Sequence, residues 1–304
     1  MTRAVVFAYH EVGVRCLRTL LAHGVEVPLV ITHADSPGEA IWFDRVARHA
    51  GWHGARVLLP PDVNAPGVLA EVRAAQPDFL FSFYYRQMLG AALLAAAPRG
   101  AYNLHGSLLP KYRGRAPVNW AVLKGERESG ATLHRMAAKP DAGAIVAQQA
   151  VPILPDDTAV EVFRKVTVAA ELALDRALPA LLAGTAEHRP QDLEHGSYFG
   201  RRTAADGRID WSAGSRAVHD LVRAVAPPYP GAHASAAGHT LKVWRTLPAT
   251  GPGAARPVLR WQDGEVRALC HDAALRLLEF EIDGSIRDAA AFHARFGAAA
   301  LALD

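Results

Sequence analysis

Three polar side chains of this 304-residue sequence have the types and spacing that acyl transfer requires. Asn103 and His105 lie two residues apart in an extended segment, so alternation directs both side chains to one face. An amide N–H can stabilise an oxyanion, and an imidazole with an ordinary pKa of about 6.5 can carry a proton near neutral pH. Asp141 follows in a loop between two extended runs, where its carboxylate could orient His105. The pattern predicts an acid–base site.

Each of these residues also has an ordinary structural interpretation. An Asn-x-His pair is common in turns and around buried histidines, and Asp141 before Ala-Gly is typical of a turn. The residues alone therefore leave open both a catalytic and a structural role.

The elements that must position these residues can be predicted from the first two-thirds of the chain, where short apolar runs alternate with helical patterns. Strands are expected over residues 4–8, 25–32, 56–59 and 78–84. Helices are expected over residues 14–21, 41–49, 68–75, 88–96 and 157–182. This order predicts an α/β fold with a Rossmann-like parallel sheet and helices on both of its faces. Ligands bind such sheets at the carboxyl ends of the strands.

The last third of the chain has a different pattern. A polar, glycine-containing stretch precedes several short extended runs separated by turn residues. We therefore expect a catalytic domain at 1–188, a linker at 189–206, and a smaller C-terminal β-rich, barrel-like (OB-like) domain at 207–304.

Composition excludes several classes of protein. The net charge is only +3, and 28 of the 33 basic residues are scattered arginines, so no nucleic-acid partner is expected. Two cysteines, Cys16 and Cys270, cannot form the disulfide framework of a small secreted protein, which favours a cytoplasmic location. The longest apolar runs, such as 89–98, are too short to span a membrane, and no signal peptide is recognisable.

Cofactor motifs are also missing from the sequence. The turn after the first strand has one glycine where a dinucleotide fingerprint has three, so NAD is not expected. The scattered histidines lack the spacing of metal ligands, so no metal is expected.

A family resemblance narrows the chemistry. Asn103-x-His105-x-Ser107-Leu108-Leu109-Pro110, followed by Asp141-x-Gly143, resembles the signature of formyltransferases that use 10-formyltetrahydrofolate. Rarer strings are similar to the formyltransferase half of the bifunctional polymyxin-resistance enzyme, which formylates UDP-4-amino-4-deoxy-L-arabinose. They are Phe7-Ala8-Tyr9-His10, Thr32-His33, Pro37-Gly38-Glu39, residues 81–86, Leu133-His134-Arg135-Met136 and residues 199–203.

The resemblance implies roles for individual residues. His105 would be the general base or proton shuttle, Asn103 would hydrogen-bond the oxyanion, and Asp141 would orient His105. The folate co-substrate would bind along Gln87, Met88, Leu89, Arg115, Ala137, Ala138, Lys139, Pro140 and Asp141. Candidate contacts for the nucleotide sugar, each with a structural alternative, are Tyr9, His10, Arg86, Arg113, Arg201 and Arg202.

Other functions remain open at this point. Methionyl-tRNA formyltransferase shares the three catalytic residues but carries a basic insertion where residues 32–39 of this chain are acidic. Another nucleotide amino sugar is a second alternative, and a binding module that has lost catalysis is a third. The resembled enzyme continues into a decarboxylase that this chain lacks, so a separate decarboxylase is an expected pathway partner.

Overall fold

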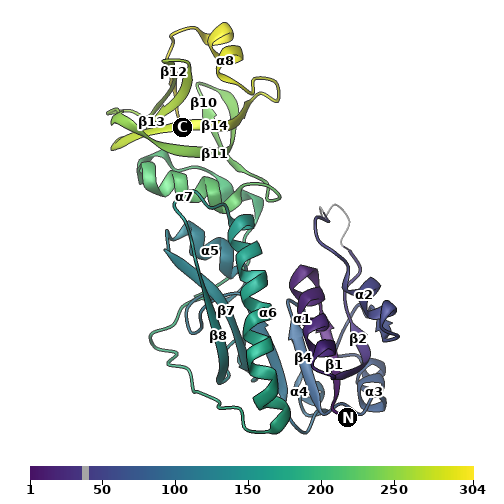
Figure 1. Cartoon of the computed structure of the whole chain (residues 1–304). Helices are drawn as coiled ribbons and strands as arrows, with labels where there is room; N and C mark the ends of the chain where they lie inside the picture. Colours follow the sequence, from purple (N-terminus) through teal and green to yellow (C-terminus); the bar gives the residue numbers. More distant parts are fainter. Residues whose placement is uncertain (36–40) are drawn as a thin grey trace. The chain divides into compact units, whose positions relative to one another are not determined.

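The computed structural model describes residues 1–35 and 41–304 (Figure 1). The acidic stretch 32–39, which argued against a tRNA substrate, therefore lies partly outside the described residues, as does the string Pro37-Gly38-Glu39. The chain divides into two compact units. The first comprises Met1–Pro117, Glu128–Val151 and Arg164–Gly200, and the second comprises Val118–Arg127, Pro152–Phe163 and Arg201–Asp304. The domain boundaries expected from the sequence stay a prediction.

The first unit contains a sheet whose strands follow the order β3-β2-β1-β4-β5-β7-β8. The strands are β1 (Arg3–Ala8), β2 (Glu26–Ile31), β3 (Arg56–Leu58), β4 (Phe79–Phe83), β5 (Ala101–His105), β7 (Glu128–Arg135) and β8 (Ile145–Pro152). Every residue of β4 is buried, as its continuous apolar run predicts for a central strand. A separate parallel pair joins β6 (Arg113–Gly114) to β9 (Tyr198–Phe199).

The strand directions differ in one place from the parallel sheet that the sequence predicts. β3, β2, β1, β4 and β5 are parallel neighbours, which confirms the Rossmann-like core. β7, however, pairs with β5 in the antiparallel direction. The chain that leaves β5 stays at the carboxyl end of the sheet before it enters β7, so β7 must run back.

Helices cover both faces of the sheet. Val5 and Phe7 of β1 share an apolar cluster with Val72 of α3 (Pro66–Ala74). Ala8, on the alternate face, lies against Gly13 of α1 (His10–Ala22). The arrangement confirms the two-sided packing that the alternating pattern predicts.

The remaining helices of this part of the chain are α2 (Val46–Trp52), α4 (Ala91–Leu94) and α6 (Ala159–Ala183). α6 begins after Thr158, whose backbone N–H donates to the Glu161 carboxylate, and it ends at Gly184 with φ at +74°. α2 and α4 are shorter than predicted. Arg45 and Gly90 have extended backbone angles, so α2 begins only at Val46 and α4 only at Ala91.

The second unit contains a six-stranded sheet in the order β10-β11-β14-β13-β12-β15. Its strands are β10 (Ala232–Ala236), β11 (His239–Pro252), β12 (Val258–Gln262), β13 (Glu265–Leu269), β14 (Ala273–Ile282) and β15 (Leu301–Ala302). The neighbours are antiparallel, and a bridge between Ala236 and Leu303 links the two edges of the sheet. The predicted barrel-like β domain is confirmed.

Helices in this unit were not predicted from the sequence. They are α5 (Pro117–Leu123), α7 (Ser215–Val225), α8 (Ala289–Phe296), and the short 3-10 helices η1 (Ala204–Gly207) and η2 (Trp211–Ala213). Val218, Val222 and Val225 of α7 join the buried core of the barrel at helical spacing. The periodicity was therefore present in the sequence, but the turn residues around it favoured strands.

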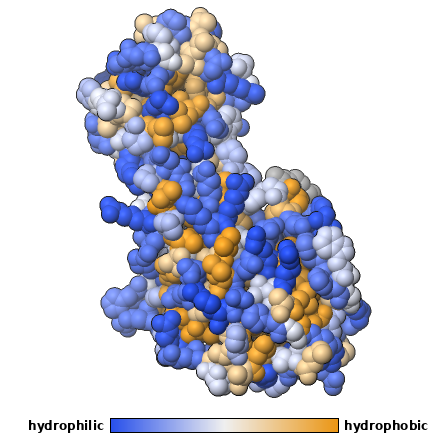
Figure 2. Space-filling view, in the orientation of Figure 1, coloured by the Kyte–Doolittle hydropathy of each residue, from blue (hydrophilic) through white to orange (hydrophobic). Residues whose placement is uncertain are grey.

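The surface of the molecule is mainly hydrophilic on the face that Figure 2 shows, with hydrophobic residues in separate patches. Among the residues that the structure describes, no helix is long and apolar enough to cross a membrane.

Candidate active site

The three predicted catalytic residues lie where β5 meets antiparallel β7. The register places His134 directly opposite Asn103 and Thr132 opposite His105. Asp141, in the loop after β7, has its Oδ1 atom 3.4 Å from Asn103 Nδ2, 3.6 Å from His105 Nδ1 and 3.5 Å from His134 Nε2. The structure therefore brings Asn103, His105 and Asp141 into one cluster and adds His134 to it.

The hydrogen bond of His105 defines which ring nitrogen is available for chemistry. Its Nε2 lies 2.8 Å from the backbone carbonyl oxygen of Tyr112. A carbonyl only accepts, so Nε2 carries the hydrogen in the neutral ring. Nδ1 then holds the lone pair, on the side that faces Asp141. A proton that arrives at Nδ1 meets a carboxylate that stabilises it.

The electrostatics of the pair favour a neutral imidazole beside a charged carboxylate. Burial lowers the pKa of His105 below its ordinary value, and the Asp141 carboxylate opposes this effect only in part. Burial alone would raise the pKa of Asp141, but the charge of protonated His105 and the Gly114 N–H are among the contacts that outweigh it and lower that pKa to about 2. At neutral pH, His105 is therefore an unprotonated base and Asp141 is ionised.

His134 is a site residue that the sequence-based reasoning missed. Its Nδ1 donates to the carbonyl oxygen of Arg135 at 2.9 Å, so Nε2 can accept from Asn103 Nδ2 at 3.1 Å. This bond fixes the orientation of the Asn103 amide. In the sequence, the string Leu133-His134-Arg135-Met136 indicates only a family resemblance, because no sequence signal gives the register between β5 and β7.

The loop that carries Asp141 is held from two sides. Asp141 has a φ of 50°, in the left-handed region, and its Oδ2 accepts from the Gly114 N–H at 3.0 Å. Gln191 Nε2 donates to the carbonyl oxygens of Asp141 and Gly143 at 3.0 and 2.6 Å. A Cβ at Gly143 would lie 1.8 Å from the carbonyl oxygen of Arg135, so only glycine fits there. Gln191 is a second residue that the sequence did not reveal.

The end of β4 approaches the site at Gly106. A Cβ on Gly106 would lie 2.0 Å from the hydroxyl oxygen of Tyr84, which follows β4 with a φ of 57°. The absence of a side chain at Gly106 therefore lets Tyr84 lie directly beside the backbone that follows His105.

The predicted cofactor segment at Gln87–Leu89 is held by hydrogen bonds to the neighbouring loop at residues 61–64. Gln87 accepts from the Val63 N–H at 2.9 Å and donates to the Pro61 carbonyl at 3.1 Å. Asn64 donates to the Met88 carbonyl at 3.0 Å and accepts from the Gly90 N–H at 2.7 Å. These bonds explain why the predicted helix over 88–96 is reduced to α4.

The other predicted cofactor residues lie near this segment or at the Asp141 loop. Met136 packs against the apolar cluster that contains Leu89, which brings the start of the Asp141 loop to the segment Gln87–Leu89. Arg115 Nη2 lies 3.5 Å from the carbonyl oxygen of Arg86. Of the remaining predicted residues, the exposed side chains are those of Met88, Ala137, Ala138 and Lys139, and Pro140 is half-buried.

The predicted substrate contacts separate into two groups. Tyr9 and His10 lie at the start of α1, and the guanidinium of Arg86 lies 4.4 Å from the centre of the Tyr9 ring. Arg113 is 7% exposed, and its Nε and Nη1 atoms have no hydrogen-bond partner among the described residues. All four belong to the first unit, together with the catalytic cluster.

Arg201 and Arg202 belong to the second unit. Arg202 stacks over the Trp120 ring at 4.8 Å and donates to the Asp206 carbonyl, whereas the Arg201 side chain is exposed. Over residues 1–35 and 41–304, no group of three or more histidine, cysteine or acidic side chains could hold a metal ion.

Comparison with protein families gives two matches. Residues 22–178 match the family described as formyl transferase, and residues 201–296 match the formyl transferase C-terminal domain.

Solved structures share the fold at low sequence identity. An N-formyltransferase from Helicobacter canadensis, in complex with folinic acid and dTDP-3-aminofucose, has a TM-score of 0.71 at 20% identity, over 91% of this chain and 99% of that chain. WlaRD, a sugar 3N-formyl transferase in the presence of dTDP and 5-N-formyl-THF, has a TM-score of 0.71 at 19% identity, over 91% and 97% of the two chains. A sugar N-formyltransferase from a Shewanella species has a TM-score of 0.62 at 20% identity, over 77% and 92%.

Proposed function

The chain belongs to the formyl transferase family and is a formyltransferase, and we propose that it formylates the amine of a nucleotide-linked amino sugar. The formyl donor in this proposal is 10-formyltetrahydrofolate, and the acceptor is UDP-4-amino-4-deoxy-L-arabinose. Structural relatives that bind folates with a dTDP-linked amino sugar, or with dTDP, support the class of donor and acceptor. The choice of UDP-4-amino-4-deoxy-L-arabinose depends on the resemblance described above, and polymyxin resistance through lipid A modification is part of the same proposal.

The observation that carries the proposal is the pairing of a neutral His105 with an ionised Asp141 beside the Asn103 amide. Formyl transfer to an amine needs a base that accepts the amine proton and a donor that stabilises a developing oxyanion. The cluster supplies both functions within 3.6 Å of one carboxylate oxygen.

The residues can then be assigned to steps. Bound 10-formyltetrahydrofolate supplies the formyl carbon. As the sugar amine adds to that carbon, Asn103 Nδ2 donates to the oxygen that becomes negative, in place of its long contact to Asp141. His105 Nδ1 takes the proton that the amine loses and returns it to the folate nitrogen as the bond to the formyl carbon breaks. Asp141 stabilises the imidazolium in between.

We assign the folate to the residues that the resemblance indicates. Gln87 uses its side chain on the loop at 61–63, so the pterin would have to bind the backbone of Gln87–Leu89. Ala137–Asp141 would form the other wall, since Met136 and Leu89 share one apolar cluster. Arg115, beside Arg86, would face the anionic part of the folate.

The nucleotide sugar would use Tyr9, His10 and Arg86 at the start of α1, together with Arg113. Arg113 offers a nearly buried guanidinium, which suits a diphosphate. Arg201 and Arg202 remain proposed contacts. We also propose a cytoplasmic location, which agrees with both cysteines being buried free thiols. A separate decarboxylase in the same pathway is the last part of the proposal.

The test is a formylation assay of the purified chain with 10-formyltetrahydrofolate and three acceptors, namely UDP-4-amino-4-deoxy-L-arabinose, dTDP-3-aminofucose and methionyl-tRNA. We expect a formamide product on the UDP sugar, identified by mass spectrometry. Product mainly on the dTDP sugar would support a nucleotide-sugar formyltransferase but would replace the proposed acceptor. Product on the tRNA would replace the proposal with the tRNA enzyme, and no product on any acceptor would overturn it.

A further inference from the structure

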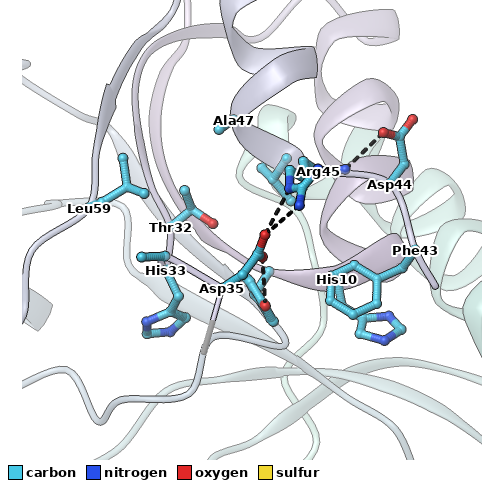
Figure 3. A pocket seen from close by; sticks show the side chains of 12 residues that line it. His10, Thr32, His33, Asp35, Phe43, Asp44, Arg45, Ala47 and Leu59 are labelled. Atoms are coloured by element: carbon cyan, nitrogen blue, oxygen red, sulfur yellow. Dashed lines mark hydrogen bonds and ion pairs between the residues drawn. The ribbon is translucent and has the colours of Figure 1, made fainter. Parts of the chain in front are cut away.

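A pocket that the catalytic steps do not use opens at the carboxyl ends of β1 and β2 (Figure 3). Its cavity volume is about 130 Å³, and it is open to solvent. The residues that matter for its chemistry are Tyr9, His10, Thr32, Asp35, Phe43 and Arg45. In open α/β sheets, ligands bind at this end of the strands.

One wall of the pocket is aromatic. The Phe43 ring lies 3.8 Å from the His10 ring, centre to centre, with 31° between the planes, and it meets the Tyr9 ring edge-on at 5.2 Å. Aromatic faces of this kind are used by proteins to stack nucleobases.

The opposite side of the pocket is polar and centres on Asp35, which Figure 3 shows pointing into the middle. Its Oδ1 accepts from the Tyr9 hydroxyl at 3.1 Å, and its Oδ2 accepts from Arg45 Nε and Nη2 at 2.9 and 2.7 Å. Each carboxylate oxygen has two lone pairs, so Oδ1 can accept one more hydrogen bond. The Asp35 side chain is 28% exposed, which leaves it accessible from the pocket.

The position of Asp35 in the fold indicates which ligand donates that bond. In sheets of this topology, an acidic residue shortly after the second strand accepts from a ribose hydroxyl, and Asp35 follows the end of β2 at Ile31. The turn before α1 lacks the glycines of a dinucleotide site, so a single nucleoside fits better than NAD. We propose that this pocket binds the nucleoside of the acceptor, with Asp35 accepting from the ribose 2′-hydroxyl. This inference rests on the proposed function, and it predicts a preference for ribonucleotides.

Asp44 provides a matched control because it lines the same pocket but points away from it in Figure 3. Its carboxylate accepts from Arg48 and lies 2.6 Å from His49 Nε2, on the side of α2. An Asp44→Asn variant therefore changes a nearby carboxylate without changing the proposed ribose contact.

The experiment measures the binding of UDP and of 2′-deoxy-UDP to the full chain by calorimetry. These probes differ only in the 2′-hydroxyl. We expect the wild type to bind UDP at least about 10-fold more tightly than 2′-deoxy-UDP, because a hydrogen bond to a charged group typically contributes this much. Asp35→Asn keeps an oxygen acceptor but loses its charge, so it should reduce this ratio to the smaller value of a neutral hydrogen bond, whereas Asp44→Asn should keep it. Phe43→Ala should weaken both probes equally and keep the ratio, which separates the ribose contact from general damage to the pocket.

Equal affinities of the wild type for the two probes, or a ratio that Asp35→Asn leaves unchanged, would overturn the inference. The formylation assay separates this outcome from failure of the proposed function. A chain that formylates its acceptor but does not discriminate the probes disproves only the role of Asp35. A chain that discriminates the probes through Asp35 but formylates no acceptor disproves only the proposed function.

Discussion

Two aspartates, Asp141 and Asp35, stand at the centres of the catalytic cluster and of the pocket, but the protein holds them in different ways. Asp141 is 14% exposed and contacts Asn103, two histidines and a backbone N–H. Asp35 is 28% exposed, and its charged partner, Arg45, is 60% exposed.

The difference matters because exposed ion pairs contribute little to stability, typically about 0–1 kcal/mol. Asp35 can therefore exchange contacts with a ligand at small cost, which suits recognition. Asp141 cannot leave its partners without leaving buried polar groups unpaired, which suits a fixed catalytic geometry.

The largest effect is expected from His105→Ala, which removes the base of the cluster. We expect kcat/KM for formyl transfer to fall by roughly 10²–10⁴-fold, the usual contribution of a general base. His195→Ala is the matched control, because the His195 side chain is 83% exposed and should leave turnover unchanged. Unchanged turnover in His105→Ala would mean that His105 is not the base, whereas absence of turnover in the wild type as well would favour a binding module.

A direct comparison of Asp141→Asn with Asp35→Asn should give effects of different kinds. Asp141→Asn removes the charge that stabilises protonated His105, so we expect kcat to fall by roughly 10²-fold. Asp35→Asn should raise KM for the nucleotide sugar and leave kcat within about twofold, as expected for a group that binds both ground and transition states. Steady-state kinetics with each substrate varied in turn distinguish the two. A loss of kcat in both variants would contradict the division between chemistry and recognition.

A smaller effect is expected from Asn64→Ala, which removes the hydrogen bonds of the Asn64 side chain to the backbone of Met88 and Gly90. We expect KM for the folate to rise by about 3–10-fold, since one or two exposed hydrogen bonds are lost. The KM for the sugar nucleotide should not change. Asn64→Asp keeps the acceptor for the Gly90 N–H and should give an intermediate value. An equal rise in both KM values would show that the hydrogen bonds of Asn64 do not act specifically on the folate site.

The smallest effect concerns the pH dependence of kcat/KM. Burial lowers the pKa of His105 from its ordinary value of 6.5, so the ring stays neutral at pH values somewhat below 6.5. On the acid side of the pH profile, the midpoint of the fall in kcat/KM should therefore lie below pH 6.5. In Asp141→Asn, the carboxylate that raises this pKa is gone, so the midpoint should move to still lower pH. A midpoint that rises in the variant would contradict the assignment of the limb to His105.

Several features of this protein were determined by local sequence alone. Continuous apolar runs specified strands such as β1 and β4, and Thr158 and Gly184 marked the ends of α6. The two-residue spacing of Asn103 and His105 was enough to place both side chains on one face. Patterns of this kind depend on neighbours in the chain, so they can be read without knowledge of the fold.

Only the tertiary structure decided the features that depend on distant segments. The antiparallel direction of β7 placed His134 opposite Asn103, and the Tyr112 carbonyl fixed the tautomer of His105. The surroundings of Asp35 likewise combine residues from the ends of two strands with the segment before α2. Strand direction, register and burial arise from contacts between segments far apart in the chain, and one-dimensional periodicity does not encode those contacts.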